Sequence, residues 1–163
     1  MINCTRLLCA KKGFNDEIRY VKGKPADTNR PIVVWNSTKS CNLQCVHCYF
    51  DARADRDKDE LTTEQAKVMI DDLAAFGAPV LLFSGGEPFM RTDLFTLGAY
   101  ALSKGLRTVI STNGTLITKE VAENIKDAGF SYVGISLDGM EKVNDEFRKS
   151  RGAFRKTLEG IRN

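Results

Sequence analysis

The sequence predicts an α/β fold in which parallel strands alternate with helices. Three times along the chain, a polar capping residue is followed by an amphipathic segment, a glycine and a short apolar run rich in β-branched residues. These apolar runs are continuous, which is typical of strands that are covered on both faces. Short connections between helices and strands then favour a parallel sheet with right-handed crossovers.

The first unit begins with a predicted strand at residues 32–35 and continues with a helix after Thr62. Thr62 and Gln65 resemble a capping box, in which each side chain bonds the backbone of the other residue. Gly77 is expected to end this helix, because glycine readily adopts the left-handed conformation found at helix ends. Residues 80–83 form the second predicted strand. The apolar face of the helix carries Ala66, Met69, Ile70 and Leu73.

The next two units repeat this order of elements. Thr92 is predicted to cap a helix that ends at Gly105, and residues 108–110 form the third strand. Thr118 precedes the following helix, which leads to a fourth strand at residues 132–137. The apolar faces carry Leu94, Leu97, Ala101 and Leu102 in the first of these helices and Val121, Ala122, Ile125 and Ala128 in the second.

Composition limits the class of protein. With 163 residues and 42% hydrophobic content, the chain is long enough for one folded domain. Its 24 basic and 21 acidic residues are interspersed, so no extended basic face for nucleic acid is expected. No apolar stretch reaches the roughly 18 residues that a membrane helix needs, and the start lacks the pattern of a secretory signal. We therefore expect a cytoplasmic protein without nucleic-acid or membrane partners.

Cys41, Cys45 and Cys48 form a C-x3-C-x2-C pattern directly after the first predicted strand. Three thiolates can hold three corners of an iron–sulfur cube and leave one iron without a protein ligand. A zinc site that uses His47 as fourth ligand is an alternative, although a residue next to Cys48 is poorly placed to join it in a tetrahedron. Disulfides are disfavoured by the odd total of five cysteines. The separate Cys4 and Cys9 are interpreted as ordinary thiols.

Polar and glycine-rich segments follow the other predicted strands. In a parallel sheet the carboxyl ends of the strands meet at one edge, so these segments are expected to converge with the cysteines on one site. Ser136 and Asp138 would share one face of their strand, because side chains alternate along a strand. Structural turns remain an alternative for the glycine-containing segments, and a solvated position is the ordinary reading of Arg148. The segments are Ser84-Gly85-Gly86-Glu87-Pro88, Ser111-Thr112-Asn113-Gly114 and Asp138-Gly139.

Together these motifs resemble the radical S-adenosylmethionine (SAM) superfamily over roughly residues 30 to 160. The resemblance implies a [4Fe-4S] cluster on Cys41, Cys45 and Cys48, with SAM bound at the remaining iron. It also implies a partial (βα) barrel of about four units, with residues 1–29 as an N-terminal extension and residues 30–163 as a core domain that is incomplete at its C-terminal end. The residues that it places around SAM are Gly85, Gly86, Glu87, Pro88, Ser111, Asn113, Ser136, Asp138 and Arg148.

The resemblance also implies particular roles for these residues. Gly85-Gly86-Glu87-Pro88 would receive the SAM amino group through backbone carbonyls and the acidic side chain, and Ser111 and Asn113 would line the pocket. Ser136 and Asp138 would face the ribose and the methionine carboxylate, which Arg148 can also pair with. His47 stands where the superfamily usually has an aromatic residue, and it either stacks near the adenine or is a tolerated loop residue.

A narrower resemblance is to haem-biosynthesis radical SAM proteins, including NirJ-like and didecarboxysirohaem-processing members. It is carried by residues 1–9, 19–20, 30–36 and 81–88. This likeness implies reductive cleavage of SAM to a 5′-deoxyadenosyl radical that modifies side chains of an iron tetrapyrrole, with electrons from a low-potential donor. The alternatives are a peptide-modifying radical SAM maturase and, less favoured, a zinc-binding or electron-carrier module.

Overall fold

The computed structural model describes residues 30–163 except Arg53 and Arg56. Within this part of the chain, four parallel strands form one sheet, and their order in space follows their order in the sequence. The predicted parallel α/β architecture is thereby confirmed. The predicted N-terminal extension, with Cys4 and Cys9, lies outside the described residues. The strands are β1 (Val33–Thr38), β2 (Val80–Gly85), β3 (Arg107–Thr112) and β4 (Tyr132–Ile135).

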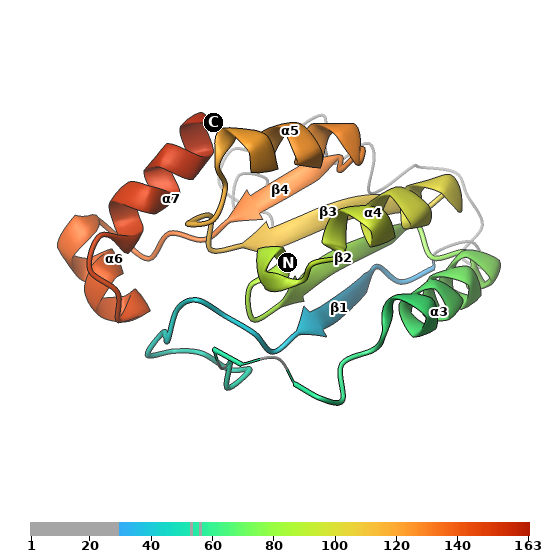
Figure 1. Ribbon diagram of the computed structural model, residues 1–163, viewed down its shortest axis with the longest axis horizontal. Coiled ribbons are helices and arrows are strands. Elements are labelled where there is room, and N and C mark those ends of the chain that lie inside the picture. Colours follow the sequence, from blue (N-terminus) through green and yellow to red (C-terminus); the bar gives the residue numbers. More distant parts are fainter. Residues whose placement is uncertain (1–29, 53, 56) are drawn as a thin grey trace, which may run out of the picture. The chain divides into compact units, whose positions relative to one another are not determined.

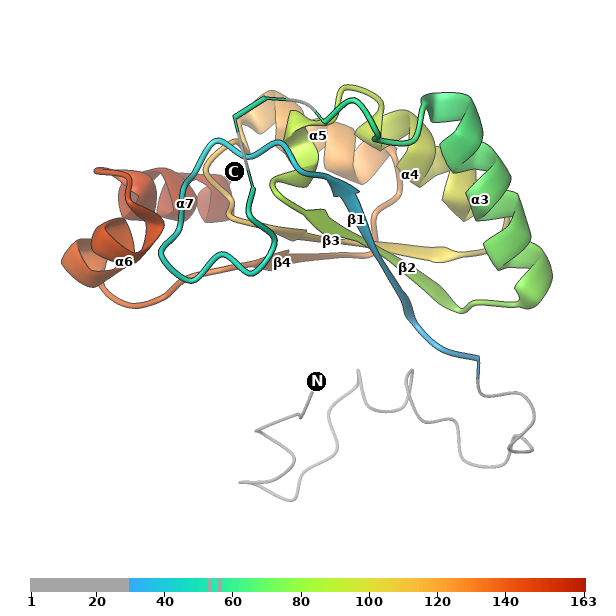
Figure 2. The same cartoon turned by 90° about the horizontal axis from the view of Figure 1, so that it is seen from below.

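Helices cover one face of this sheet. Viewed along the edge of the sheet in Figure 2, α3 (Thr63–Phe76), α4 (Leu94–Ser103) and α5 (Lys119–Asp127) all lie on the same side. The short 3-10 helix η2 (Pro88–Met90) follows β2. Beyond the carboxyl end of β4, α6 (Glu141–Arg148) and α7 (Ala153–Arg162) lie next to each other (Figure 1). None of the described helices is long and apolar enough to cross a membrane.

The core fills the space between the sheet and its three helices. Ile70, Leu81, Phe83, Leu97 and Ile110 have no solvent exposure, and they form one cluster. The ring of Phe83 lies 5.6 Å from that of Trp35 and 5.7 Å from that of Phe130. These residues fix the direction of the strands and thus where their carboxyl ends meet.

The opposite face of the sheet differs from the sequence expectation. We expected both faces to be covered, yet Val34 is 58% exposed and Tyr132 is 57% exposed. The reason is that α3, α4 and α5 all pack on the other face (Figure 2). An arrangement with helices outside and an open inner face is consistent with the predicted partial barrel.

Most predicted helix boundaries are confirmed, and one is wrong. Thr62 and Gln65 form the capping box of α3, Gly77 ends that helix in the left-handed conformation, and Thr118 caps α5. Thr92 does not cap α4, whose N-cap is Asp93. The Asp93 carboxylate makes no capping bond either, because Thr63 and an arginine bind it instead.

The predicted strand boundaries also shift, and β2 and β3 extend to Gly85 and over Arg107–Thr112. Strand β1 extends to Thr38 instead of ending at residue 35, because Thr38 pairs with Gly85 of β2. Strand β4 ends at Ile135 instead of residue 137, although the Ser136 amide still donates to the Thr112 carbonyl at 3.0 Å. The residues that follow β4 are therefore loop residues.

Candidate functional site

A cavity of about 230 Å³ lies at the carboxyl ends of the strands. Its walls come from residues 41–52 of the segment 39–60, which we call the cysteine loop. The ends of β2 and β3 with the residues that follow them, the loop after β4 and α6 complete the walls. Most of the residues that the sequence places in one site do meet here. Those that line the cavity are Cys41, Cys45, Cys48, Gly85, Gly86, Ser111, Asn113, Ser136, Asp138 and Arg148.

The three cysteines line this cavity at different depths. Cys41 is buried, Cys45 is half-buried and Cys48 is exposed, and none of them forms a disulfide. Burial raises the pKa of the Cys41 thiol, and the nearby Glu87, Cys45 and Cys48 raise it further. The Leu43 amide donates to Cys41 Sγ at 3.4 Å and opposes this rise. Cys41 therefore favours its neutral form unless a cation stabilises the thiolate.

The donor set distinguishes between a single ion and a cluster. Zinc needs about four donors within 2.0–2.3 Å of one centre. Among residues 30–163 without Arg53 and Arg56, no three His, Cys, Asp or Glu side chains are arranged to hold one metal ion. A cluster attaches each thiolate to a different iron atom, so the sulfur atoms need not converge on one point. Three thiol donors around one cavity are therefore compatible with an iron–sulfur cluster.

Gly85 and Gly86 bring the β2 turn directly against the start of the cysteine loop. Gly85 has φ +124°, and a Cβ on Gly86 would collide with the Ser40 carbonyl group. The Gly86 amide donates to the Thr38 carbonyl at 2.7 Å, and the Glu87 amide donates to the Ser40 carbonyl at 2.8 Å. Only glycine permits this close approach of two backbones.

Glu87 and Pro88 do not line the cavity. The Glu87 carboxylate is fully buried and accepts from Thr112 Oγ1 at 2.7 Å, from the Asn113 amide at 2.9 Å and from the Phe89 amide at 3.2 Å. Burial raises the pKa of Glu87, and these three hydrogen bonds oppose that rise. Pro88 begins η2. In this arrangement Glu87 fixes the segment after β3 from behind the cavity wall.

Asn113 connects the cysteine loop to the segment after β3. Its Nδ2 donates to Asn42 Oδ1 at 2.9 Å, and Asn42 Nδ2 donates to Thr115 Oγ1 at 2.8 Å. The Thr115 amide returns to Asn113 Oδ1 at 2.9 Å. Sequence reasoning missed Asn42 and Thr115. The signal for Asn42 was its position next to Cys41.

Arg148 is buried, so its reading as a solvated helix residue is wrong. It is 9% exposed, and its Nη2 lies 2.5 Å from Asp138 Oδ2 while its Nη1 donates to Cys45 Sγ at 3.6 Å. His47 Nε2 lies 3.9 Å from Asp138 Oδ1. The ring of His47 stacks against Phe147 at 5.2 Å. Helix α6 thus brings one cation to both a cavity carboxylate and a cysteine sulfur.

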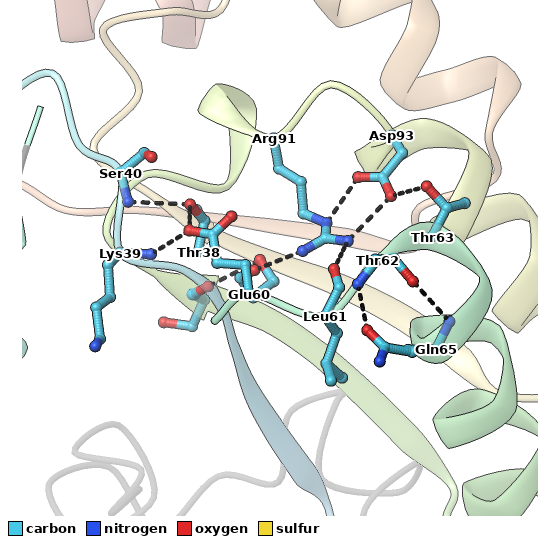
Figure 3. A network of polar contacts seen from close by, with 12 residues as sticks. Thr38, Lys39, Ser40, Glu60, Leu61, Thr62, Thr63, Gln65, Arg91 and Asp93 are labelled. Atoms are coloured by element: carbon cyan, nitrogen blue, oxygen red, sulfur yellow. Dashed lines mark hydrogen bonds and ion pairs between the residues drawn. The ribbon is translucent and has the colours of Figure 1, made fainter. Parts of the chain in front are cut away.

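A second polar network, which the sequence did not predict, surrounds the two ends of the cysteine loop (Figure 3). We call residues 37–39 and 60–61 the loop base. Arg91 Nη1 donates to the Ser37 carbonyl at 2.9 Å, and its Nη2 donates to the Leu61 carbonyl at 2.8 Å. Arg91 Nε also pairs with Asp93 Oδ1 at 2.7 Å. One guanidinium therefore bonds the chain on both sides of the loop.

Asp93 completes this network. Its Oδ2 accepts from Thr63 Oγ1 at 2.7 Å and from Arg91 Nη2 at 3.0 Å. Burial raises the pKa of Asp93, but the bonds from Thr63 and Arg91, together with the Arg91 charge, outweigh it, and the pKa is lowered. The carboxylate is thus held in its charged form beside Arg91.

The chain is similar to known proteins in sequence and in fold. A sequence model described as the radical SAM superfamily matches residues 35–163. The chain is 49% identical to Fe-coproporphyrin III synthase of Methanosarcina barkeri, over 100% of this chain and 43% of that protein. It is 44% identical to AdoMet-dependent heme synthase of the same species, over 83% of this chain and 40% of that protein.

A third relative is pre-heme d1 synthase of Dinoroseobacter shibae, which is 42% identical over 89% of this chain and 35% of that protein. The chain therefore spans less than half the length of these relatives. Among solved structures, native anSMEcpe with bound AdoMet (SAM) has a TM-score of 0.65 at 22% identity and covers 79% of this chain and 38% of that one. Streptococcus suis SuiB bound to precursor peptide SuiA has a TM-score of 0.61 at 25% identity, over 76% and 28%.

Proposed function

The chain belongs to the radical SAM superfamily of enzymes, and on this premise we propose that Cys41, Cys45 and Cys48 bind a [4Fe-4S] cluster that leaves one iron for SAM. One observation carries the proposal: the three thiols line the same cavity as the strand-end residues, and within the described part of the chain, residues 30–163 without Arg53 and Arg56, no fourth cysteine lines it. When bound, a reduced cluster of this kind supplies the electron that cleaves SAM to a 5′-deoxyadenosyl radical.

The other residues of the cavity supply binding and orientation in this proposal. Gly85 and Gly86 bring the backbone of the turn against Thr38 and Ser40 at the cavity wall. Ser111, Asn113 and Ser136 offer polar groups from neighbouring strand ends. The buried Arg148 and the half-buried Asp138 form an ion pair that can receive the carboxylate and amino groups of SAM. Glu87 acts indirectly, because its carboxylate holds the Asn113 amide.

For the substrate, we propose an iron tetrapyrrole whose side chains are modified during haem biosynthesis. The support comes from the relatives named as Fe-coproporphyrin III synthase, AdoMet-dependent heme synthase and pre-heme d1 synthase, at 42% to 49% identity. A low-potential electron donor completes the reaction, because the cluster must be reduced before SAM is cleaved. The proposal concerns the whole enzyme, of which this chain carries the SAM-binding part.

The test of the ligand assignment is anaerobic reconstitution with iron and sulfide. The wild-type chain should gain charge-transfer absorption and, after reduction, an EPR signal of a [4Fe-4S] cluster. Changing any one of Cys41, Cys45 or Cys48 to Ala should abolish assembly, whereas Cys4→Ala should matter much less. Full iron content in any of the three variants would refute the assignment.

The test of the chemistry is incubation of the reconstituted chain with SAM and dithionite. Formation of 5′-deoxyadenosine supports the enzyme reading. A cluster that is indifferent to SAM would instead indicate an electron carrier, and a colourless protein with stoichiometric zinc would indicate a zinc-binding module.

A peptide-modifying maturase is the second candidate, because the structural neighbour SuiB binds a precursor peptide. The two substrate classes differ in a direct binding measurement. Titration of the full enzyme with iron coproporphyrin III should shift the porphyrin absorption band if the tetrapyrrole proposal is right. No shift, together with SAM cleavage stimulated by a peptide, would favour the maturase.

A further inference from the structure

We propose that Arg91 is a positioning residue that clasps both ends of the cysteine loop and so holds the three thiols in place before the cluster binds. The inference rests on the proposed function, since it assigns the loop a cluster to hold. Arg91 lies outside the described residues that line the cavity.

The Arg91 guanidinium lies between the two ends of the cysteine loop. It donates to the carbonyl of Ser37, just before the loop, and to the carbonyl of Leu61, just after it. The Arg91 side chain is 1% exposed, and its Cζ lies 5.2 Å from the centre of the Trp35 ring. A buried cation costs free energy unless its charge and donors are satisfied, and here the Ser37 and Leu61 carbonyls and the Asp93 carboxylate accept from it.

Glu60 lies at the end of the cysteine loop and bonds residues at its start. Its Oε1 accepts from Thr38 Oγ1 at 2.5 Å and from the Lys39 amide at 2.9 Å (Figure 3). Thr38 Oγ1 in turn accepts from the Ser40 amide at 3.0 Å. The chain therefore returns to its starting point at residue 60, and the segment that contains all three cysteines is tied at both ends.

Arg91 also links this loop base to the turn after β2. The Arg91 amide donates to the Pro88 carbonyl at 3.0 Å, and the preceding residues Gly86 and Glu87 bond Thr38 and Ser40. The short stretch 86–91 thus contacts the start of the cysteine loop through its backbone and both ends through its arginine. The distance between Cys41 and the Gly85-Gly86 turn is fixed by this stretch.

The physical benefit is that the loop is closed before the ligand arrives. Bringing the ends of a long loop together costs conformational entropy, and a cluster that binds an open loop must supply that free energy itself. Arginine suits this position better than lysine, because its planar fork can donate to two carbonyls and a carboxylate at once. Lysine has only a single ammonium group, which cannot reach all three acceptors.

The test compares Arg91→Lys with Arg107→Lys. Arg107 serves as control because it lies at the opposite end of the sheet, where its Nε bonds the Ser131 hydroxyl. In the cluster-free chain, we expect Arg91→Lys to speed hydrogen exchange at the Lys39 and Ser40 amides. In the reconstituted chain, iron loss to a chelator should be about ten- to a hundredfold faster, because removal of groups that orient metal ligands lowers metal affinity by that factor and we expect the change in the dissociation rate. Arg107→Lys should change neither rate.

Equal exchange and equal iron loss in both variants would overturn the proposal. If Arg91→Lys does not fold, Asp93→Asn replaces it, because this change leaves the guanidinium but removes the charge that orients it; iron loss no faster than in Arg107→Lys would then overturn the proposal. If the wild-type chain assembles no cluster, the proposed function fails on its own. The exchange measurement on the cluster-free chain still decides whether Arg91 clasps the loop.

Discussion

The cysteine loop is held in different ways at its base and at its tip. At the loop base, a buried arginine and two carboxylates bond the chain through hydrogen bonds of 2.5 to 3.0 Å. The loop tip, residues 45–50, is largely exposed, with Val46 at 63% and Tyr49 at 79%. Its described contacts with the rest of the chain are mostly with α6, through the Val46 amide to the Phe147 carbonyl at 2.8 Å, the His47 ring on Phe147 and Arg148 on Cys45. His47 Nε2 also lies 3.9 Å from Asp138 Oδ1, in the loop before α6.

Because of this difference, the three cysteines are restrained to different degrees. Cys41 is buried near the loop base, so its position is set by the framework of strands. Cys48 is exposed at the loop tip, where few contacts restrain it. A fixed first ligand defines where a cluster sits, while an adaptable last ligand can close around it. Changes at the loop base should therefore be more harmful than changes at the loop tip.

The largest effect is expected from Gly86→Ala. The added methyl group would collide with the Ser40 carbonyl group, and this backbone cannot move without opening the loop base. We expect a loss of about 2–3 kcal/mol in the free energy of unfolding, as for other overpacked positions, and a strongly reduced yield of cluster. Urea denaturation and iron analysis after reconstitution measure the two effects.

Gly105→Ala is the matched control for this change. A Cβ at Gly105 meets no atom within 4 Å, but the residue has φ +86°. Its cost is therefore conformational only, about 1–2 kcal/mol for an L-residue in the left-handed region, and the cluster yield should not fall. If both glycine variants lose the cluster equally, the loop base has no special role.

The second effect concerns the acid sensitivity of the loop base. Because the pKa of Asp93 is lowered in the folded chain, its stabilising contribution is present above the unfolded value of about 3.9 and is lost as pH falls toward the folded value. Asp93→Asn should cost about 1.5–2 kcal/mol at pH 7, the lower part of the range for hydrogen bonds to charged groups. This difference from wild type should shrink below about pH 4.

Asp71 provides the comparison for this pH profile. Hydrogen bonds from Lys104 and Tyr100 lower the pKa of Asp71, but the pair lies at the exposed surface of α3 and α4. Asp71→Asn should change stability little at any pH, because solvent screens surface ion pairs. Glu87 should show the opposite pH dependence. Burial raises the pKa of its carboxyl group, so its contribution to the stability of the fold falls as pH rises. A pH-independent cost of Asp93→Asn would contradict the predicted role of the charge.

The sequence predicted features that depend on residues close together along the chain, but it failed where the interacting residues are far apart in sequence. The capping box at Thr62 and the helix end at Gly77 were predicted correctly, because caps use neighbours only a few residues away. Thr92 was assigned as a cap for the same local reason, and that prediction was wrong. The neighbouring Asp93 is the N-cap, and its carboxylate is bound by Arg91 and by Thr63 from another helix.

The sequence predicted the site residues that follow the ends of strands. It missed the residues whose hydrogen-bond partners are backbone groups. The cysteines, glycines and polar residues after β2, β3 and β4 share one cavity, as the parallel sheet requires. Arg91 gave no signal, because its acceptors are carbonyls of Ser37 and Leu61, which are distant in sequence and have no characteristic side chain. The burial of Arg148 likewise depends on how α6 packs against the cysteine loop.

A third, smaller effect tests whether the stability of α3 affects how the loop base holds the cysteine loop. Thr62→Ala removes the cap of α3 directly after Leu61, and we expect a loss of about 1 kcal/mol in the free energy of unfolding. The rate of iron loss should stay close to wild type, because Arg91 still bonds the Leu61 carbonyl. Thermal unfolding and chelator challenge test the two expectations. Faster iron loss would show that the start of α3, rather than the clasp, fixes this end of the loop.

The smallest effect is expected at the loop tip, from His47→Ala. The variant loses the stacking of His47 on Phe147, which is worth about 0.5 kcal/mol at an exposed site. Hydrogen exchange at the Val46 amide should become roughly twofold faster in the cluster-free chain, in proportion to that energy, while the Lys39 and Ser40 amides keep their rates. Tyr49→Ala is the control, since this side chain is 79% exposed. If His47→Ala loosens the loop base as strongly as the tip, the two regions form one cooperative unit, and the cysteines are positioned together.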